Sequence, residues 1–215
     1  MNKKASLETE ATVTVDKRKR RINLRALTVT AIMSAVGAIL MLAELPLPSL
    51  IPAFVKLDFS ELPALITTFA FGPGWGVLVC LLKNLLHLMF GSSMGVGELA
   101  NFVLGAAFVF IAGLIYQKKK KRAGALLGCL AGAAAMGLVS VPLNYFIVYP
   151  LYAKVFNMTE DMIVGMYQSI LPKADTLLKD LLIFNLPFTV AKGIIDSAMC
   201  FLLYKPLSPL LKGRH

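Results

Sequence analysis

The sequence predicts an all-α integral membrane protein, built as one bundle of six transmembrane helices. Of its 215 residues, 57% are hydrophobic and only 16% are charged, whereas about a quarter of the residues of a soluble protein are charged. The mean hydropathy is +0.72. Most of the 22 Lys and Arg residues lie in clusters at the ends of apolar segments, which is typical of cytoplasmic loops of membrane proteins.

The net charge of +10 does not indicate a nucleic-acid-binding protein. The basic clusters lie before residue 25, in the loop 118–122 and at the C-terminal end. Basic residues beside membrane segments hold those segment ends in the cytoplasm and contact anionic lipid. We therefore expect a multi-pass protein of the cell membrane, with both termini cytoplasmic, lipid contacts and no nucleic-acid partner.

The chain divides into a tail and one membrane domain. Residues 1–23 are polar, basic and without hydrophobic periodicity, so this cytoplasmic tail is predicted to be disordered. Residues 24–215 form the single transmembrane domain. The three cysteines stand singly in apolar segments and are expected to be small buried hydrophobic residues: Cys80, Cys129 and Cys200.

The first span, residues 24–45, has about the 20 residues that the hydrocarbon core requires. Ala31 and Ala35 lie four residues apart on it, and small residues at this spacing let another helix approach closely. From spacing alone, that helix could belong to the same bundle or to a partner. A proline-rich apolar loop, residues 46–60, follows and is expected to cap a ligand pocket as a lid.

The second span, residues 59–71, is short. Counting it as a crossing keeps the basic loop 118–122 on the same side as the basic tail, as the positive-inside rule requires. The third span, residues 74–90, follows a turn at residues 72–74.

Three polar side chains lie within the third span. Lys83 and His87 share a helix face and Asn84 is adjacent to it. A charged side chain at the centre of a membrane helix costs roughly 2.5 to 3.5 kcal/mol, so these groups should face inward. They could contact a ligand directly or form a structural network. A proton relay through His87 would need acidic partners, and only Asp196 is expected within the helix cores.

The fourth span covers residues 96–116 and the fifth covers residues 123–149. Pro142 is expected to bend the fifth span, and Asn144 lies just beyond the bend. Its amide could join two helices or bind the edge of a planar heterocycle.

An external loop, residues 151–179, contains an amphipathic piece at 159–170 that begins with a Thr159 cap. The last span, residues 180–204, carries Asn185, Thr189 and Lys192. Lys192 could pair with Asp196, four residues on, or face a ligand.

Five segments resemble the riboflavin-specific substrate-binding (S) components of energy-coupling factor (ECF) transporters: KLDFSELPALI, FGPGWG, KNLLH, PLNYFIVYPLY and LPFTVAKGII. The similarity covers nearly all of the chain after the tail. It implies a six-helix bundle of the ECF S-component type that binds riboflavin near its outer face. It also implies that Ala31 and Ala35 dock on a transmembrane coupling (T) subunit, which works with two ATP-binding subunits.

The resemblance further implies which groups hold the flavin ring, namely Asn144, Thr189 and Lys192. Typical riboflavin binders have an asparagine where this chain has Thr189, so that contact would be shortened, bridged by water or supplied by Asn185. An isoalloxazine ring also needs apolar walls. The full set of expected substrate-binding residues is Leu57, Asp58, Phe59, Lys83, Asn84, His87, Asn144, Tyr145, Asn185, Thr189 and Lys192.

The chain lacks a Walker motif, a glycine-rich phosphate loop, a nucleophile with a base, and a metal-ligand cluster. We therefore predict a protein that is not an enzyme, holds no metal or cofactor apart from riboflavin as substrate, and takes ATP hydrolysis from partner subunits. Two alternatives remain. One is an S component for another vitamin, such as pantothenate, thiamine or a flavin precursor. The other is an intramembrane enzyme or a structural assembly factor.

Overall fold

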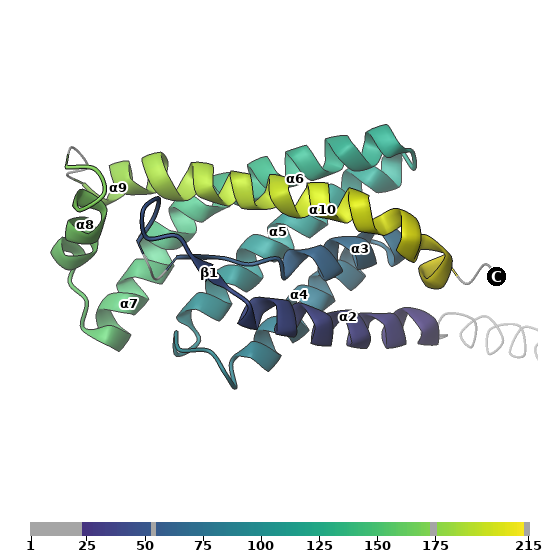
Figure 1. Cartoon of the computed structure of the whole chain (residues 1–215), viewed down its shortest axis with the longest axis horizontal. Coiled ribbons are helices and arrows are strands. Elements are labelled where there is room, and N and C mark those ends of the chain that lie inside the picture. Colours follow the sequence, from purple (N-terminus) through teal and green to yellow (C-terminus); the bar gives the residue numbers. More distant parts are fainter. Residues whose placement is uncertain (1–22, 53–54, 173–175, 213–215) are drawn as a thin grey trace, which may run out of the picture.

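The structure is a computed structural model that describes residues 23–52, 55–172 and 176–212, with side chains as far as residue 203. The predicted disordered tail lies outside this part, apart from Asn23. Long helices dominate the described chain (Figure 1). In order, the elements are α2 (Leu24–Leu42), β1 (Leu45–Pro46), β2 (Lys56–Leu57), α3 (Glu61–Phe71), α4 (Pro73–His87), α5 (Val96–Lys118), α6 (Arg122–Leu143), the π-turn η1 (Asn144–Val148), α7 (Tyr149–Phe156), α8 (Glu160–Gln168), α9 (Leu177–Asp180), the π-turn η2 (Leu181–Asn185) and α10 (Leu186–Lys212).

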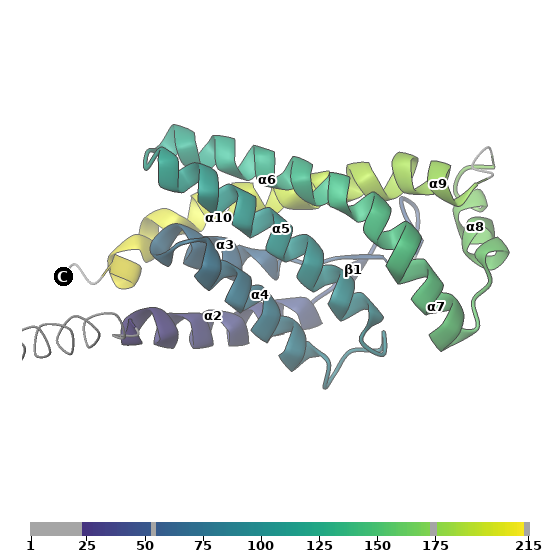
Figure 2. The same cartoon turned by 180° about the vertical axis from the view of Figure 1, so that it is seen from behind.

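The two ends of the bundle differ. The start of α2, the turn between α5 and α6 and the far end of α10 lie at one end, and β1, α7, α8 and α9 lie at the other (Figures 1 and 2). The α5–α6 turn holds the basic cluster 118–122. The basic segment ends are therefore gathered on one side of the bundle, as the charge pattern predicts.

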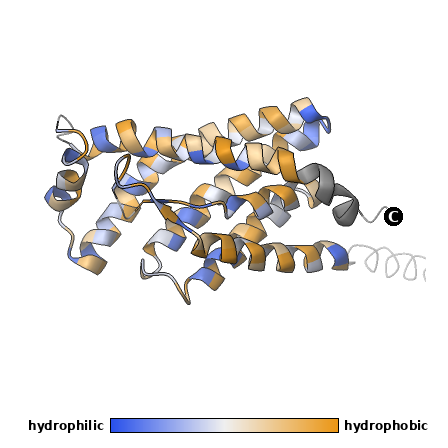
Figure 3. Cartoon of the chain, in the orientation of Figure 1, coloured by the Kyte–Doolittle hydropathy of each residue, from blue (hydrophilic) through white to orange (hydrophobic). Residues whose placement is uncertain are grey.

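Four helical stretches of the described residues are long and apolar enough to cross a membrane: Leu24–Leu42, Val96–Lys118, Arg122–Phe156 and Leu177–Leu203. Hydrophobic residues, shown in orange in Figure 3, occur along the length of these helices. With 11 and 15 residues, α3 and α4 are shorter, about 17 and 23 Å as helices. An all-α membrane protein is confirmed, and the number of six crossings stays a prediction.

The helix boundaries follow local chemistry. Asn23 caps α2 by accepting a hydrogen bond from the Ala26 N–H at 3.2 Å, and Thr159 caps α8 as predicted, accepting from the Met162 N–H at 3.3 Å. The predicted turn between α3 and α4 is also present: Gly72 has a φ of 112°, which glycine adopts without steric cost, and Pro73 begins α4. The first helix ends at Leu42, three residues before the predicted end of its span.

The fifth helix is longer than predicted. It does not end at residue 149 but runs as a continuous helical stretch from Arg122 to Phe156. Pro142 lies inside α6, and the π-turn η1 begins two residues later. A π-turn inserts an extra residue while keeping backbone groups hydrogen-bonded. Here the Tyr149 N–H donates to the Asn144 carbonyl, so this part of the backbone is satisfied within the helix, as lipid requires.

Glycines set the spacing between α5 and α6. A Cβ on Gly132 would lie 2.6 Å from the carbonyl oxygen of Phe108, and one on Gly128 would lie 2.6 Å from that of Ala112. Both distances are too short for a real side chain, so the two backbones touch directly. Small residues make such close packing possible in lipid, where helices associate through van der Waals contact.

The loop after α2 folds over the end of the bundle that carries α7, α8 and α9. Its two short strands pair antiparallel, with Leu45 opposite Leu57 and Pro46 opposite Lys56. Between the strands, Ile51 is fully buried in an apolar cluster that includes Val148 and Tyr167. We call residues 45–52 and 55–57 the lid.

Candidate functional site

A cavity of about 330 Å³ lies beside the lid and is lined by lid residues together with α5, η1, α7 and α10. This volume is within the usual range for small-molecule sites, about 300 to 1,000 Å³. Six of the substrate-binding residues predicted from the sequence line it: Asp58, His87, Asn144, Asn185, Thr189 and Lys192. These residues come from five different elements or their flanks and meet only in the folded bundle.

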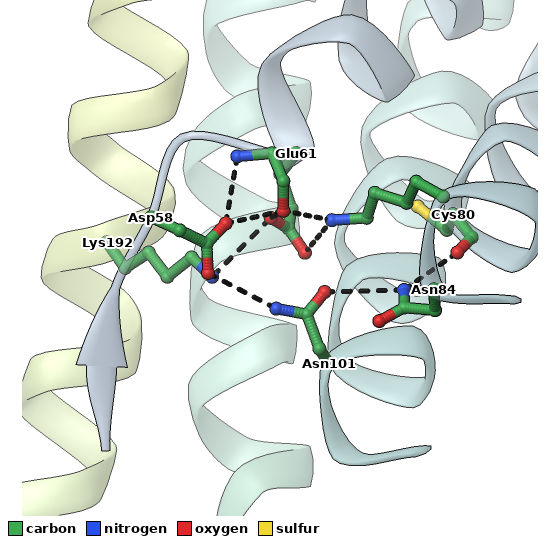
Figure 4. Close-up of polar contacts among 8 residues, drawn as sticks. Asp58, Glu61, Cys80, Asn84, Asn101 and Lys192 are labelled. Atoms are coloured by element: carbon green, nitrogen blue, oxygen red, sulfur yellow. Dashed lines mark hydrogen bonds and ion pairs between the residues drawn. The ribbon is translucent and has the colours of Figure 1, made fainter. Parts of the chain in front are cut away.

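The charged residues of the site form an ion-pair network next to the cavity (Figure 4). The Lys192 ammonium lies 2.9 Å from Asp58 Oδ2 and 3.4 Å from Glu61 Oε2. Glu61 Oε1 also lies 3.0 Å from the Lys83 ammonium, and Lys83 donates a hydrogen bond to Ser60 Oγ. Two buried lysines are therefore matched by two buried carboxylates, which offsets the cost of removing these charges from water.

The network decides one open alternative and corrects one expectation about acidic residues. Lys192 pairs with Asp58 and Glu61, rather than with Asp196 one turn along its own helix. In addition, Asp196 is not the only acid inside the bundle, because Glu61 and Glu98 are buried as well. The sequence signal for Glu61 was its place three residues after Asp58 in a segment that otherwise reads as apolar helix.

Asn101, which the sequence reasoning missed as a site residue, ties the network to the third predicted span. Its amide donates to Asp58 Oδ2 at 3.3 Å and its carbonyl oxygen accepts from Asn84 at 3.4 Å. Asn84 also donates to the backbone carbonyl of Cys80 at 2.7 Å. Gly105, one turn beyond Asn101, leaves room for the Glu61 carboxylate, since a Cβ there would lie 2.6 Å from Glu61 Oε1.

Two of the asparagines that line the cavity lie at π-turns. Asn144 is the first residue of η1 and Asn185 is the last residue of η2. Asn144 donates to the Ser140 carbonyl at 2.8 Å, which leaves its side-chain oxygen for another partner. π-turns are frequent at functional sites because they re-aim side chains within a helix.

The Asn185 side chain is hydrogen-bonded to two tyrosines. Its oxygen accepts from the Tyr167 hydroxyl at 2.5 Å, its NH₂ group donates to the Tyr149 hydroxyl at 3.1 Å, and the two hydroxyls lie 2.6 Å apart. Burial raises the pKa of Tyr167, so its hydroxyl remains a neutral donor. Because Tyr167 belongs to α8, this triangle connects α8 to the cavity wall.

Five predicted substrate-binding residues do not line the cavity. Lys83 and Asn84 are buried in the network just described, which corresponds to the structural alternative considered for them. Tyr145 is 38% exposed and packs its ring edge-on against Phe146. Leu57 and Phe59 are half-buried on either side of Asp58. Ligand contact by these five residues stays a prediction.

The predicted docking residues lie on the outer face of α2. Ala31 and Ala35 are exposed, whereas Thr30, Ser34 and Gly37 turn into the bundle. Gly37 packs against Lys83, whose Cδ would be 3.2 Å from a Cβ at this position. The inner face of α2 is therefore used for internal packing, and the alanine pair remains accessible.

Comparison with known proteins identifies relatives of the whole bundle. A family model described as "ECF transporter, substrate-specific component" matches residues 25–208. The chain is 34% identical to the riboflavin transporter RibU of Staphylococcus aureus (strain TCH60) and 29% identical to the riboflavin transporter FmnP of Bacillus subtilis (strain 168), in both cases across 90% of this chain and 97% of the relative. A solved structure of the S component of a bacterial ECF transporter superposes with a TM-score of 0.70 at 33% identity, covering 89% of this chain and 99% of that one.

Proposed function

The chain belongs to the substrate-specific components of ECF transporters, and on that premise we propose that it binds riboflavin with high affinity and serves its uptake across the cell membrane. It is a transport component and not an enzyme. ATP hydrolysis is supplied by two ATP-binding subunits, which act through a transmembrane T subunit. The named relatives, all riboflavin transporters, support riboflavin as the substrate.

The observation that carries the proposal is the polar grouping in the cavity wall. Asn144, Thr189 and Lys192 offer an amide, a hydroxyl and an ammonium, and the edge of an isoalloxazine ring carries the carbonyl oxygens and ring nitrogens that such groups bind. Apolar side chains, among them Leu104, Met136 and Phe188, line the same cavity and suit the faces of the ring. Thr189 and Asn185 together would replace the asparagine that typical riboflavin binders have.

In the membrane, the proposed bundle crosses six times. α3 and α4 cross as short helices, which puts both termini and the basic loop 118–122 on the cytoplasmic side. The lid and the cavity then face outward, where the vitamin arrives. Ala31 and Ala35 face the T subunit.

The test is the spectrum and flavin affinity of the purified full-length protein. We expect a bound yellow chromophore with flavin absorption bands. Lys192→Ala and Asn144→Ala should each weaken riboflavin binding by about 1 to 3 kcal/mol, the cost of removing one partner of a buried hydrogen bond. Wild-type affinity in both variants would remove the pocket assignment. A colourless protein that ignores riboflavin but binds pantothenate, thiamine or a flavin precursor would transfer the function to that vitamin.

A further inference from the structure

Asp196 is a buried acidic residue that belongs neither to the ion pairs described above nor to the cavity wall. It lies on α10, one turn beyond Lys192, and has no exposed surface. Among the described residues, neither of its side-chain oxygens has a hydrogen-bond partner, and the residues that line the cavity do not include it. A buried carboxylate without a partner is very costly, and such a group avoids this cost by taking up a proton.

The charges around Asp196 also favour the protonated, neutral form. Besides burial, the groups that act on its carboxyl are Glu61, Lys192, Asp58 and Lys83. These four already balance, because two ammonium groups and two carboxylates face each other at 2.9 to 3.4 Å. An ionised Asp196 would add a third negative charge to two positive ones, whereas a protonated Asp196 leaves the balance unchanged.

The carboxylate that Lys192 uses instead is attached to the lid. Asp58 directly follows Leu57, the last residue of β2, and its Oδ2 atom lies 2.9 Å from the Lys192 ammonium. Lifting this end of the lid off the bundle therefore separates the ion pair. Lys192 would then keep only the more distant Glu61, at 3.4 Å, and a buried charge that loses its partner is strongly destabilising.

Asp196 is in the right position to replace Asp58. Residues four apart on a helix are neighbours on one face, and the flexible stem of a lysine lets its ammonium reach along that face in either direction. Because α10 is continuous from Leu186 to Lys212, Lys192 can change partners without any change in the backbone of its helix. Total charge is conserved if Asp196 loses its proton as the Asp58 carboxylate leaves.

We propose that Asp196 is a proton-binding site that serves as the reserve counter-ion of Lys192. With the lid closed, Lys192 pairs with Asp58 and Glu61, and Asp196 is a neutral acid. When the lid opens, Asp196 gives its proton to the water that enters, and the Lys192 ammonium turns to the new carboxylate. This exchange lowers the cost of opening the lid, and it does not depend on which vitamin the cavity holds.

The first test measures the protonation state of Asp196 in the purified full-length protein, without ligand and at neutral pH. The infrared difference spectrum between wild type and Asp196→Asn should contain the C=O stretching band of a protonated carboxylic acid. Other carboxyl groups cancel in this difference. A difference spectrum with carboxylate bands alone would overturn the proposal.

The second test measures opening of the lid by hydrogen–deuterium exchange, again without ligand. The Ile51 N–H donates to the Leu47 carbonyl at 3.0 Å and is protected while the lid is folded. Asp58→Asn weakens the closed ion pair and should speed this exchange. Asp196→Asn removes the reserve counter-ion and should slow it about tenfold, the effect of one hydrogen bond between charged groups.

Ser197→Ala is the matched control for the second test. Ser197 is the next residue of α10, is also buried, and donates to the Gly193 carbonyl of its own helix at 2.6 Å, so its loss should leave lid exchange unchanged. Unchanged or faster exchange in Asp196→Asn, or equal slowing in Ser197→Ala, would overturn the change of partners. If Asp196→Asn does not fold, Asp196→Leu takes its place and should also slow the lid. Neither test uses riboflavin, so this inference and the proposed function can fail separately.

Discussion

A lysine with no exposed surface depends on the carboxylates around it, and Lys83 is the clearest example in this protein. Its ammonium lies 3.0 Å from Glu61 Oε1 and donates to Ser60. Lys83→Met keeps the volume but leaves Glu61 with the Ser60 hydroxyl at 3.0 Å and the more distant Lys192 ammonium at 3.4 Å. Breaking a buried ion pair by removing one partner costs about 3 to 5 kcal/mol, so we expect a large fall in the thermal unfolding midpoint in detergent.

Lys56→Met is the matched control, because Lys56 pairs with Glu44 at the lid, where their side chains are 30% and 28% exposed. A pair that water still reaches contributes about 1 kcal/mol or less. If Lys56→Met and Lys83→Met lowered the unfolding midpoint equally, the buried network would not be the stabilising feature described here.

At the residue scale the sequence predicted the buried cations but not their partners. The cost of charge in a membrane helix indicates that Lys83, His87 and Lys192 turn inward. Their carboxylate partners come from other elements, and Asp58 and Lys192 are 134 positions apart. Periodicity reports which face of one helix is buried, but it does not report which residue of another helix that face meets. Of the two alternatives for Lys192, pairing with Asp196 is not the one that the structure shows, because Lys192 pairs with Asp58 and Glu61. Glu98 was not predicted as the partner of His87.

Among the elements, the lid packs onto the bundle through Ile51, with Leu47 and Val55 partly buried against the same apolar cluster. Ile51 is fully buried in the apolar cluster with Val148 and Tyr167, whereas its neighbour Leu50 is 63% exposed. Ile51→Ala should loosen the lid, since truncating a buried isoleucine costs about 2 to 5 kcal/mol. We expect riboflavin to dissociate at least tenfold faster in stopped-flow fluorescence, with Leu50→Ala as the control that leaves the rate unchanged. Equal rates in both variants would mean that the lid does not retain the ligand.

The contact between α5 and α6 makes a second prediction for the elements. Gly132→Ala places a methyl group 2.6 Å from the Phe108 carbonyl oxygen, and forcing extra volume into a packed interface costs about 1 to 3 kcal/mol. Gly74→Ala, where a Cβ meets nothing within 4 Å, is the control. The unfolding midpoint should fall for Gly132→Ala only. A similar fall for Gly74→Ala would mean that the added methyl group lowers stability even where it does not disturb the contact between α5 and α6.

Short sequence patterns predicted the helix cap and the turn, which depend only on residues close together in the chain. The Thr159 cap and the turn at Gly72 are confirmed because a capping hydroxyl and a glycine-proline turn act over three or four residues. The π-turns η1 and η2 were not predicted, since hydrophobic periodicity does not distinguish a single wide turn from the α-helix around it. The two turns bring Asn144 and Asn185 into the cavity wall, and helical periodicity alone provides no geometric reason for these two residues to meet.

For the whole molecule, composition and charge placement were sufficient to predict a helical membrane bundle with its basic segments at one end. They could not decide the number of crossings, because α3 and α4 are too short for length to decide. The cavity depends on how the helices pack and how the lid folds back, and hydropathy reports neither. The family resemblance, in contrast, covers the whole bundle and is confirmed by the match to residues 25–208.

The whole assembly makes the final prediction, because the proposed transport needs a surface that binding does not. Ala31 and Ala35 are exposed on α2, and the buried residues of that helix lie on its other face. Ala35→Trp should therefore leave riboflavin affinity unchanged, since the indole projects away from the cavity. It should abolish ATP-dependent riboflavin uptake into vesicles that also contain the T and ATP-binding subunits, because the bulky ring keeps the partner helix from close contact. Leu138→Trp adds an indole to another exposed position, on α6, and should affect neither measurement. Loss of riboflavin affinity in Ala35→Trp, or normal uptake, would show that this alanine face is not where the energy of ATP hydrolysis enters.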